Sequence, residues 1–309
     1  MERASIVIVN WNAGAVLHDC LAAVFASDGV NRDQVIVVDN ASTDGSQNGL
    51  TAMYPTLEVI QNSRNVGFAR AVNQGLLAAR GEFAVLLNPD VVLEPYALFR
   101  LIEFMTEHPE AGVAGPRLLD RDGAIQGSAR RDPSVWTALF GRSAPLTRLF
   151  PNNRVSQREI PALSVEDGGP IQVDWVSGAC LVARRTAWEG VGLLDERFFL
   201  FWEDADWCRR FRQAGWRVYY VPSASGTHLV GVSRARRRLG SIRDFHVSAY
   251  RYYRKHQARH ALHPLSILVG TGLIASLAVR SIQILWSPRP PRQDGSSPAP
   301  RGTRRSNSR

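Results

Sequence analysis

Short apolar runs alternate with helix-like segments over the first hundred residues of this chain. Four apolar, partly β-branched runs predict strands, at 5–9, 35–38, 57–61 and 83–87. Apolar residues at spacings of three and four predict helices at 15–26, 45–54, 67–80 and 95–107. Strands that alternate with helices predict an α/β fold with a mostly parallel sheet flanked by helices.

Polar residues follow three of these strands. Asn10-Trp11-Asn12 follows the first, Asp39-Asn40 follows the second, and Asn88-Pro89-Asp90 follows the fourth. Each group alone is explained by an ordinary turn. Because the carboxyl ends of parallel strands meet at one edge of a sheet, where ligands bind, the three groups together predict a binding site.

Carboxylates are packed among aromatic residues in the segment 198–207, whose sequence is FFLFWEDADW. One explanation is structural, because the helix dipole favours acidic residues in a first turn and Asp206 would pair with Arg210. That explanation does not account for Glu203 and Asp204, which apolar neighbours flank. Carboxylates beside aromatic walls tend to have raised pKa values, so the sequence favours these two as catalytic bases.

His228 lies among small residues, in SASGTHLVGVS, which predicts a close-packed loop. A lone histidine is more often structural than a ligand. Together with Asp90, however, it offers the nitrogen and oxygen ligands that suit Mg²⁺ or Mn²⁺, with ligand phosphates completing the shell. Both interpretations stay open at this point.

Basic residues are concentrated in the last quarter of the chain. From residue 234 onward there are 16 Lys or Arg and two Asp or Glu, a net of +14, whereas residues 1–233 carry a net of −5. This asymmetry indicates an anionic partner, either a membrane surface or nucleic acid. An uncharged run at 265–279 continues past Arg280 to residue 286, which suits a spanning, an interfacial or a buried helix.

The changes in composition predict four parts. They are a globular domain at 1–235, a basic aromatic helical segment at 236–263, an apolar membrane-associated helix at 264–286 and a disordered basic tail at 287–309. Residues 128–170, rich in Arg, Ser, Pro and Asn, predict loops over the sheet edge. No secretory signal precedes the first strand, and three cysteines form no disulfide framework, so we expect a cytosolic globular domain.

Seven blocks in order resemble the family 2 glycosyltransferases with the GT-A nucleotide-sugar-binding fold, and in particular their bacterial rhamnosyltransferase-like branch. The blocks are VIVNWN, VVDNASTDGS, NVGFARAVNQGL, LLNPDVVL, VSGACLVARR, GLLDERFFLFWEDADWCRR and HLVGVS. The resemblance implies inverting transfer of a sugar, rhamnose being one candidate, from a dTDP- or UDP-linked donor with Mg²⁺ or Mn²⁺. It also implies a polyprenyl-linked or cell-envelope glycan acceptor at the cytoplasmic face of an anionic membrane, with the enzyme peripheral or held by one C-terminal helix.

The same resemblance implies a role for each matching residue. Donor binding would fall to Asn10, Asn12, Asp39, Asn65, Arg70, Asn88, Ser177 and Gly178. Asp204, next to Glu203, matches the catalytic base. Asp90 matches the metal-binding carboxylate of the family's Asp-x-Asp motif, and His228 matches a histidine that completes the metal shell in some relatives. Asn88 stands where relatives often have an acid, so it brings no charge.

Two alternatives compete with this interpretation. A nucleic-acid-binding protein would use the arginine-rich C-terminal segment, but this leaves Asp39, Asp90 and Asp204 unexplained, so we expect no nucleic acid as partner. A catalytically inactive relative that only binds a sugar nucleotide would carry the same sequence blocks.

Overall fold

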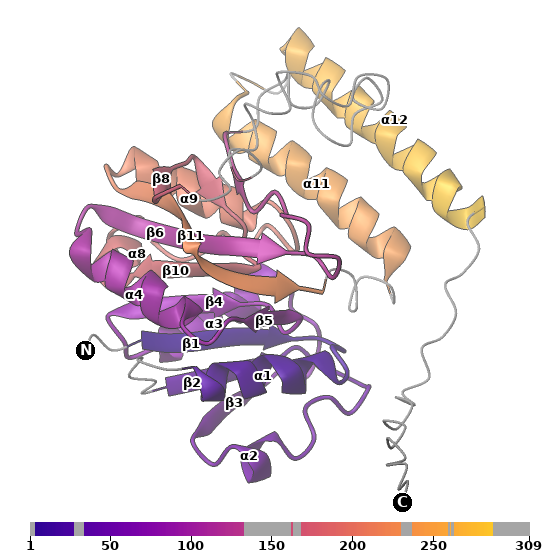
Figure 1. Cartoon of the computed structure of the whole chain (residues 1–309). Helices are drawn as coiled ribbons and strands as arrows, with labels where there is room; N and C mark the ends of the chain where they lie inside the picture. The colour runs from indigo at the N-terminus through magenta and orange to yellow at the C-terminus, as the bar shows by residue number, and fades with distance from the viewer. Residues whose placement is uncertain are drawn as a thin grey trace, which may run out of the picture.

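A mixed β-sheet with helices on both faces forms the body of the molecule (Figure 1). The computed structural model describes residues 4–27, 34–132, 162, 168–229, 237–258, 260 and 263–286. Within these ranges the main sheet has nine strands, and a further pair lies apart from it. The predicted α/β fold with a central sheet and a C-terminal helical extension is confirmed.

One half of the sheet is parallel. It consists of β1 (Ala4–Asn10), β2 (Gln34–Asp39), β3 (Leu57–Gln61) and β4 (Phe83–Leu87), in the order β3-β2-β1-β4. Every residue of β1, β2 and β4 is buried, because helices cover both faces of the sheet. This explains why the predicted strands are continuous apolar runs instead of alternating ones.

The other half of the sheet contains antiparallel strands. It consists of β10 (Cys180–Arg184), β6 (Ala111–Leu119), β11 (Arg217–His228), β5 (Val91–Leu93) and β8 (Ile171–Gln172). β10 pairs antiparallel with both β4 and β6, whereas β6 and β11 are parallel. The separate pair is formed by β7 (Ala129–Arg130) and β9 (Trp175–Val176). The long strand β11 ends at the same edge as β1, β2 and β4, and this edge carries the polar strand ends.

Two hydrophobic cores lie on opposite faces of the sheet. One core contains α1 (Val16–Ala26) and α4 (Ala97–Glu107). The other core contains α3 (Phe68–Ala78), α8 (Arg185–Val191) and α9 (Glu203–Gln213). The three cysteines are buried and free, as the sequence predicted.

Three sequence predictions need correction. The helix expected at 45–54 is only the single turn α2 (Leu50–Met53), because Gly45 and Gly49 have φ of 79° and 72°, which interrupt a helix. β5 and β6 were not predicted. His228 is the last residue of β11 and lies in no loop.

Several predictions fall on residues outside the described ranges. They concern most of the loops expected at 128–170, the boundary at 235 and the tail at 287–309. The division into four parts stays a prediction.

Two C-terminal helices, α11 (Arg238–His256) and α12 (Pro264–Trp286), lie side by side beyond the sheet edge (Figure 1). α11 packs on the first turn of α9 and on the segment before it, where Tyr252 joins Ala205 and Phe198 in a small apolar cluster. Ser248 Oγ donates a hydrogen bond of 2.9 Å to the carbonyl of Leu200. α11 is therefore docked on the body of the molecule.

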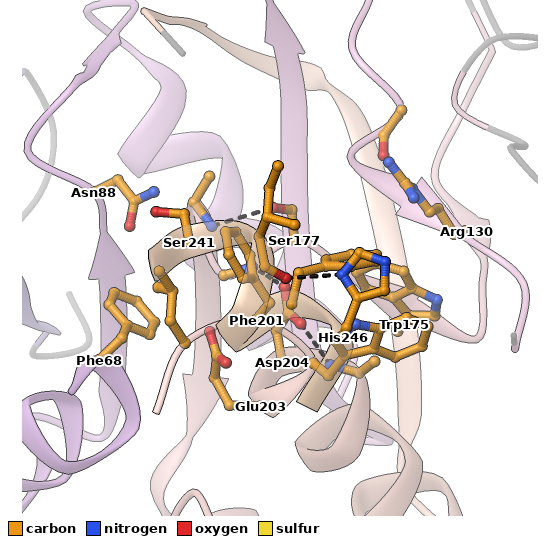
Figure 2. A pocket seen from close by; sticks show the side chains of 18 of the residues that line it. Phe68, Asn88, Arg130, Trp175, Ser177, Phe201, Glu203, Asp204, Ser241 and His246 are labelled. Atoms are coloured by element: carbon orange, nitrogen blue, oxygen red, sulfur yellow. Dashed lines mark hydrogen bonds between the residues drawn. The ribbon is translucent and has the colours of Figure 1, made fainter. Parts of the chain in front are cut away.

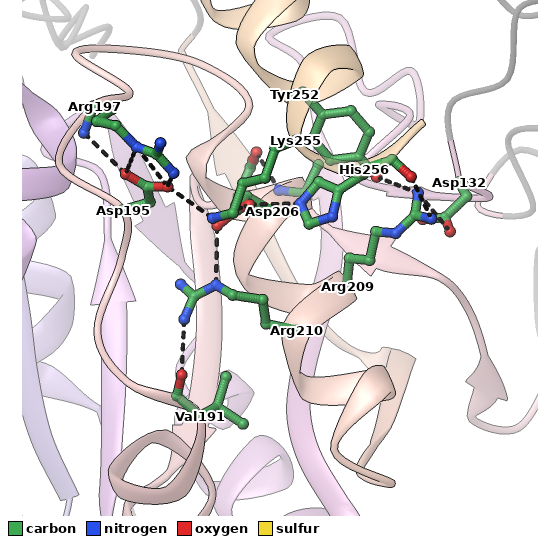
Figure 3. A network of polar contacts seen from close by, with 12 residues as sticks. Asp132, Val191, Asp195, Arg197, Asp206, Arg209, Arg210, Tyr252, Lys255 and His256 are labelled. Carbon is green, nitrogen blue, oxygen red and sulfur yellow. Dashed lines mark hydrogen bonds and ion pairs between the residues drawn. The ribbon is translucent and has the colours of Figure 1, made fainter. Parts of the chain in front are cut away.

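A buried carboxylate joins α11 to α9 (Figure 3). Asp206 has no exposed surface, and its oxygens lie 2.7 Å from Lys255 Nζ, 2.6 Å from His256 Nε2 and 3.0 Å from Arg210 Nε. The predicted Asp206–Arg210 pair is confirmed. Burial alone would raise the pKa of Asp206, but the hydrogen bonds from His256 and Lys255, with the charge of Arg210, lower it below its ordinary value.

We expect Asp206→Asn to lower the free energy of unfolding by about 3 kcal/mol, because the change leaves partly buried cations without their counter-charge. Urea unfolding followed by circular dichroism measures this loss. Glu189→Gln is the matched control, because Glu189 forms an exposed i,i+4 pair with Arg185 and should cost less than about 0.5 kcal/mol.

The Asp206 effect has a defined pH dependence. Since the pKa of this carboxyl is lowered in the folded state, its contribution is present above the unfolded value, near 3.9, and is lost as pH falls through the folded value. The two proteins should therefore converge in stability in acid. A difference that persists unchanged below pH 3 would contradict the ionic explanation.

Candidate functional site

Two adjoining cavities lie at the carboxyl ends of β1, β4 and β11. The larger has a volume of about 940 Å³ and the smaller of about 130 Å³. Both are lined by Phe68, Asn88, Leu200, His228 and Ser241. These shared residues place the two cavities next to each other.

Asp90 and His228 face each other at the junction of the cavities. Asp90 follows β4 and His228 ends β11, and the backbone N–H of Leu229 donates to the Asp90 carbonyl at 2.8 Å. Both side chains are buried, and Asp90 Oδ1 lies 3.3 Å from His228 Nε2. Nδ1 of His228 lies 2.9 Å from Gln126 Oε1, so the ring is oriented with Nε2 toward Asp90.

The Asp90–His228 pair fits part of a divalent-cation site. No group of three or more His, Cys, Asp or Glu residues gathers to hold a metal within the described part of the chain. A carboxylate oxygen and an imidazole whose second nitrogen is hydrogen-bonded are nonetheless ligands that such a cation accepts. The pair therefore suits a cation whose other ligands come from a bound diphosphate and water.

Asp204 lies on the wall of the larger cavity (Figure 2). The backbone before it is strained, because Phe201 and Trp202 have φ of 68° and 70°, a conformation that non-glycine residues adopt mainly where function requires it. Its Oδ2 accepts the N–H of Gly178 at 2.9 Å and its Oδ1 accepts the N–H of Ala205 at 2.8 Å. The carboxylate is thus held in place from both sides.

Burial raises the pKa of Asp204 above its ordinary value. The hydrogen bonds from Gly178 and Ala205, and the charge of Arg130, offset this only in part. Glu203, which is 4% exposed, lines the same wall. A carboxylate with a raised pKa is suited to accept a proton from a neutral hydroxyl.

Three of the predicted donor-binding residues form a network behind the cavities and do not line them. Nδ2 of Asn10 donates to Asp39 Oδ1 at 2.8 Å, and Asp39 Oδ2 accepts from Gln61 Nε2 at 2.5 Å. Asn12 Oδ1 accepts the N–H of Thr43 at 2.7 Å. Because these polar groups bond to each other, they fix the loops after β1 and β2.

The other predicted residues differ in how close they come to the site. Asn65 lines the smaller cavity, Asn88 lines both, and Ser177 and Gly178 line the larger. Arg70 lines neither. Its guanidinium lies 3.6 Å from Glu196 and is 54% exposed.

The sequence assigned no individual role to several lining residues. They are Trp11, Asn40, Phe68, Arg130, Trp175, Arg237, Arg238, Ser241, His246 and Arg280. Trp11 and Asn40 belong to the polar strand ends that predicted a binding site at this edge. The lining residues on α11 and α12 reach the cavity only because these two helices dock on the body of the molecule. The spacing of apolar residues along the sequence does not reveal this docking.

The sequence profile described as "Glycosyl transferase family 2" matches residues 5–157. N-acetylglucosaminyl-diphospho-decaprenol L-rhamnosyltransferase of Mycobacterium tuberculosis (strain H37Rv) is 32% identical over 265 residues, covering 79% of this chain and 82% of that protein. Low-salt glycan biosynthesis hexosyltransferase Agl10 of Haloferax volcanii is 23% identical, covering 76% of this chain and 70% of that protein.

Solved structures show the same fold at low sequence identity. GalNAc-T7 with UDP, GalNAc and Mn²⁺ matches 94% of this chain with a TM-score of 0.57 and 14% identity, and the chain spans 59% of that structure. The mannosyltransferase PcManGT of Pyrobaculum calidifontis, in complex with GDP-Man and Mn²⁺, matches 92% of this chain and 87% of its own, with a TM-score of 0.54 and 15% identity. Together with the sequence matches, these likenesses show that the chain belongs to glycosyltransferase family 2, that it is rhamnosyltransferase-like, and that it has the GT-A fold.

Proposed function

We propose that this glycosyltransferase is inverting and metal-dependent, and that it moves a sugar from a dTDP- or UDP-linked donor to a polyprenyl-linked glycan. The carrying observation is that Asp204 lines the same cavity as His228, whose Nε2 lies 3.3 Å from Asp90 Oδ1. The name of the mycobacterial relative describes rhamnose transfer to a decaprenyl-diphosphate-linked sugar. Rhamnose and that acceptor class are therefore the first to test.

The donor diphosphate would lie at the junction of the cavities, with the nucleotide extending toward Asn40 and Asn65. Asp90 and His228 would hold a Mg²⁺ or Mn²⁺ ion, which neutralises the charge of the leaving diphosphate. Asn88 brings no charge and would hydrogen-bond the ribose or a water. The buried network around Asn10, Asn12 and Asp39 would support the nucleotide side of the site from behind.

Asp204 would act as the base. The acceptor hydroxyl gives its proton to the Asp204 carboxylate as its oxygen bonds to the anomeric carbon of the donor. The bond from that carbon to the diphosphate oxygen breaks on the opposite face, so the configuration inverts. Ser177 and Gly178, which line the same cavity, would border the donor sugar.

The nucleic-acid alternative is less consistent with the contacts of α11. Lys255 pairs with Asp195 and Asp206, each at 2.7 Å, and Arg237 pairs with Asp244 at 2.7 Å. These cations bind the protein itself. We place the enzyme at the cytoplasmic face of the membrane, peripheral or held by one C-terminal helix, because α12 is long and apolar enough for that role.

Asp204→Asn should lower the transfer rate by about 10²–10⁴-fold, the usual contribution of a general base, and should leave binding of UDP or dTDP unchanged. Mass spectrometry of the glycolipid product and calorimetry of nucleotide binding measure the two effects. Glu203→Gln is the paired variant, because Glu203 is adjacent on the same wall. Full activity in Asp204→Asn would exclude Asp204 as the base, and loss only in Glu203→Gln would transfer the role to Glu203.

The raised pKa of Asp204 predicts the position of the acid limb in the pH profile. The base must be ionised, so kcat/KM should fall as pH decreases through a value above the ordinary 3.9 of aspartate. Measuring kcat/KM at saturating metal between pH 4 and 8 tests this. A profile that stays flat down to pH 4 would contradict it.

Asp90→Ala should abolish transfer at every metal concentration, whereas Asn88→Ala should raise the KM for the donor and retain some activity. The reason is that Asp90 supplies the charged ligand and Asn88 only a neutral amide. A titration of Mn²⁺ after EDTA treatment separates the two variants. Equal losses in both, or turnover that survives EDTA, would contradict the assigned metal site.

A further inference from the structure

α12 has an unusual distribution of side chains for a helix at a protein surface. Among the described residues, α12 is the one helix that is long and apolar enough to cross a membrane. It nevertheless lies along α11. Its exposed large side chains are Leu265, Ile267, Leu268, Ile274, Val279, Ile282, Leu285 and Trp286. Arg280, its one charged residue, lies on the partly covered side. A helix facing water shows the opposite arrangement, so the exposed side of α12 is suited to lipid.

The contacts between the two helices fix how α12 meets a membrane. His246 Nε2 lies 3.0 Å from Ser276 Oγ and Tyr253 Oη lies 3.4 Å from Ser266 Oγ, so the helices are antiparallel. α11 carries charged residues along its length, including Arg243 and Lys255. If α12 crossed the bilayer in this arrangement, α11 would carry those charges into hydrocarbon at high cost. α12 is therefore expected to lie in the membrane interface.

The side of α12 that faces α11 also forms a wall of the larger cavity. Arg280 and Ile284, one turn apart on α12, line it together with Arg238 and Ile242 of α11. Neither Arg238 nor Arg280 has an ion-pair partner among the described residues. Asp204 lies in the same cavity (Figure 2). One wall thus combines two cations with apolar side chains, close to the lipid-facing surface.

This combination matches an amphiphile with a phosphorylated head. Guanidinium groups bind phosphate oxygens through paired, charge-assisted hydrogen bonds. The apolar chain of such a molecule has a path along α12, whose exposed residues continue from Ile284 to Leu285 and Trp286. The cavity that Asp204 and the two arginines line has a volume of about 940 Å³, which is in the range of cavities that hold small-molecule ligands.

We propose that Arg238 and Arg280 bind the diphosphate of the membrane-embedded acceptor lipid and thereby place its sugar toward Asp204. This inference rests on the proposed function for the identity of the lipid, but its test does not require turnover.

The test measures binding of the purified full-length protein to vesicles by sedimentation. Phosphatidylcholine vesicles contain either undecaprenyl diphosphate or phosphatidylglycerol at equal total charge. Arg238→Gln/Arg280→Gln should raise the diphosphate-lipid concentration at half-maximal binding by about tenfold or more, since two charge-assisted contacts are lost. Binding to the phosphatidylglycerol vesicles should change little.

Arg243→Gln is the matched control, because Arg243 is an exposed α11 residue that lines neither cavity. It should bind both vesicles like the unmodified protein, and thermal melting should confirm that all variants are folded. The arginine site would be overturned if Arg243→Gln weakened vesicle binding as much as the double variant does. It would also be overturned if the double variant lost binding equally on both kinds of vesicle, or lost none. Selective diphosphate binding without sugar transfer from any donor would refute the proposed function and leave the lipid site standing.

Discussion

The buried carboxylate of Asp206 connects the catalytic body to the C-terminal helices. It receives Lys255 and His256 from α11 while pairing with Arg210 on its own helix. α11 in turn holds α12 through the His246–Ser276 contact. Together with the Ser248–Leu200 hydrogen bond and the Tyr252 cluster, the Asp206 network fixes the cavity wall that contains Arg238 and Arg280 relative to Asp204.

Two carboxylates in the first turn of α9 have opposite environments. The hydrogen bonds and charges of three basic residues lower the pKa of Asp206 despite its burial, whereas burial raises the pKa of Asp204, which has only backbone N–H groups and a more distant Arg130 to offset it. Divergent pKa values of neighbouring acids are a recurring way to separate structural from chemical roles. Here Asp206 faces α11, and Asp204, which we propose as the base, faces the cavity.

The sequence predicted strands correctly where a continuous apolar run is also buried on both faces of the sheet. β1, β2 and β4 are fully buried, so their apolar runs and the polar residues after them were visible. β6 was missed because it contains Gly112 and Gly115. A Cβ atom at Gly112 would lie 2.7 Å from Trp216, and one at Gly115 would lie 2.8 Å from Val176. Close packing therefore favours glycine at both positions, and glycine weakens the sequence pattern that indicates a strand.

For the site, the sequence located the chemical groups but not their neighbours. The Asp90–His228 contact was predicted from residue types. Gln126, whose side chain hydrogen-bonds Nδ1 of His228, lies in no sequence motif and was not predicted. Asn10 and Asp39 were expected to bind the donor, and their role stays a prediction. The sequence did not show that their side chains bond to each other, since a strand-end position does not reveal which way a side chain turns. Arg280 carried a signal, being the single charge of an apolar helix, but its position on the cavity that Asp204 also lines depends on tertiary docking.

The central claim is that the two cavities form the donor and acceptor sides of one transferase site. It is tested most directly by incubating the protein in detergent with a polyprenyl-diphosphate-linked sugar, Mn²⁺ and a panel of dTDP-, UDP- and GDP-sugars, followed by mass spectrometry of the lipid. We expect addition of one sugar to the lipid from a dTDP- or UDP-linked donor, and NMR of the product should show an inverted anomeric configuration. Transfer with retention of configuration, or no transfer to any polyprenyl-linked acceptor, would contradict it.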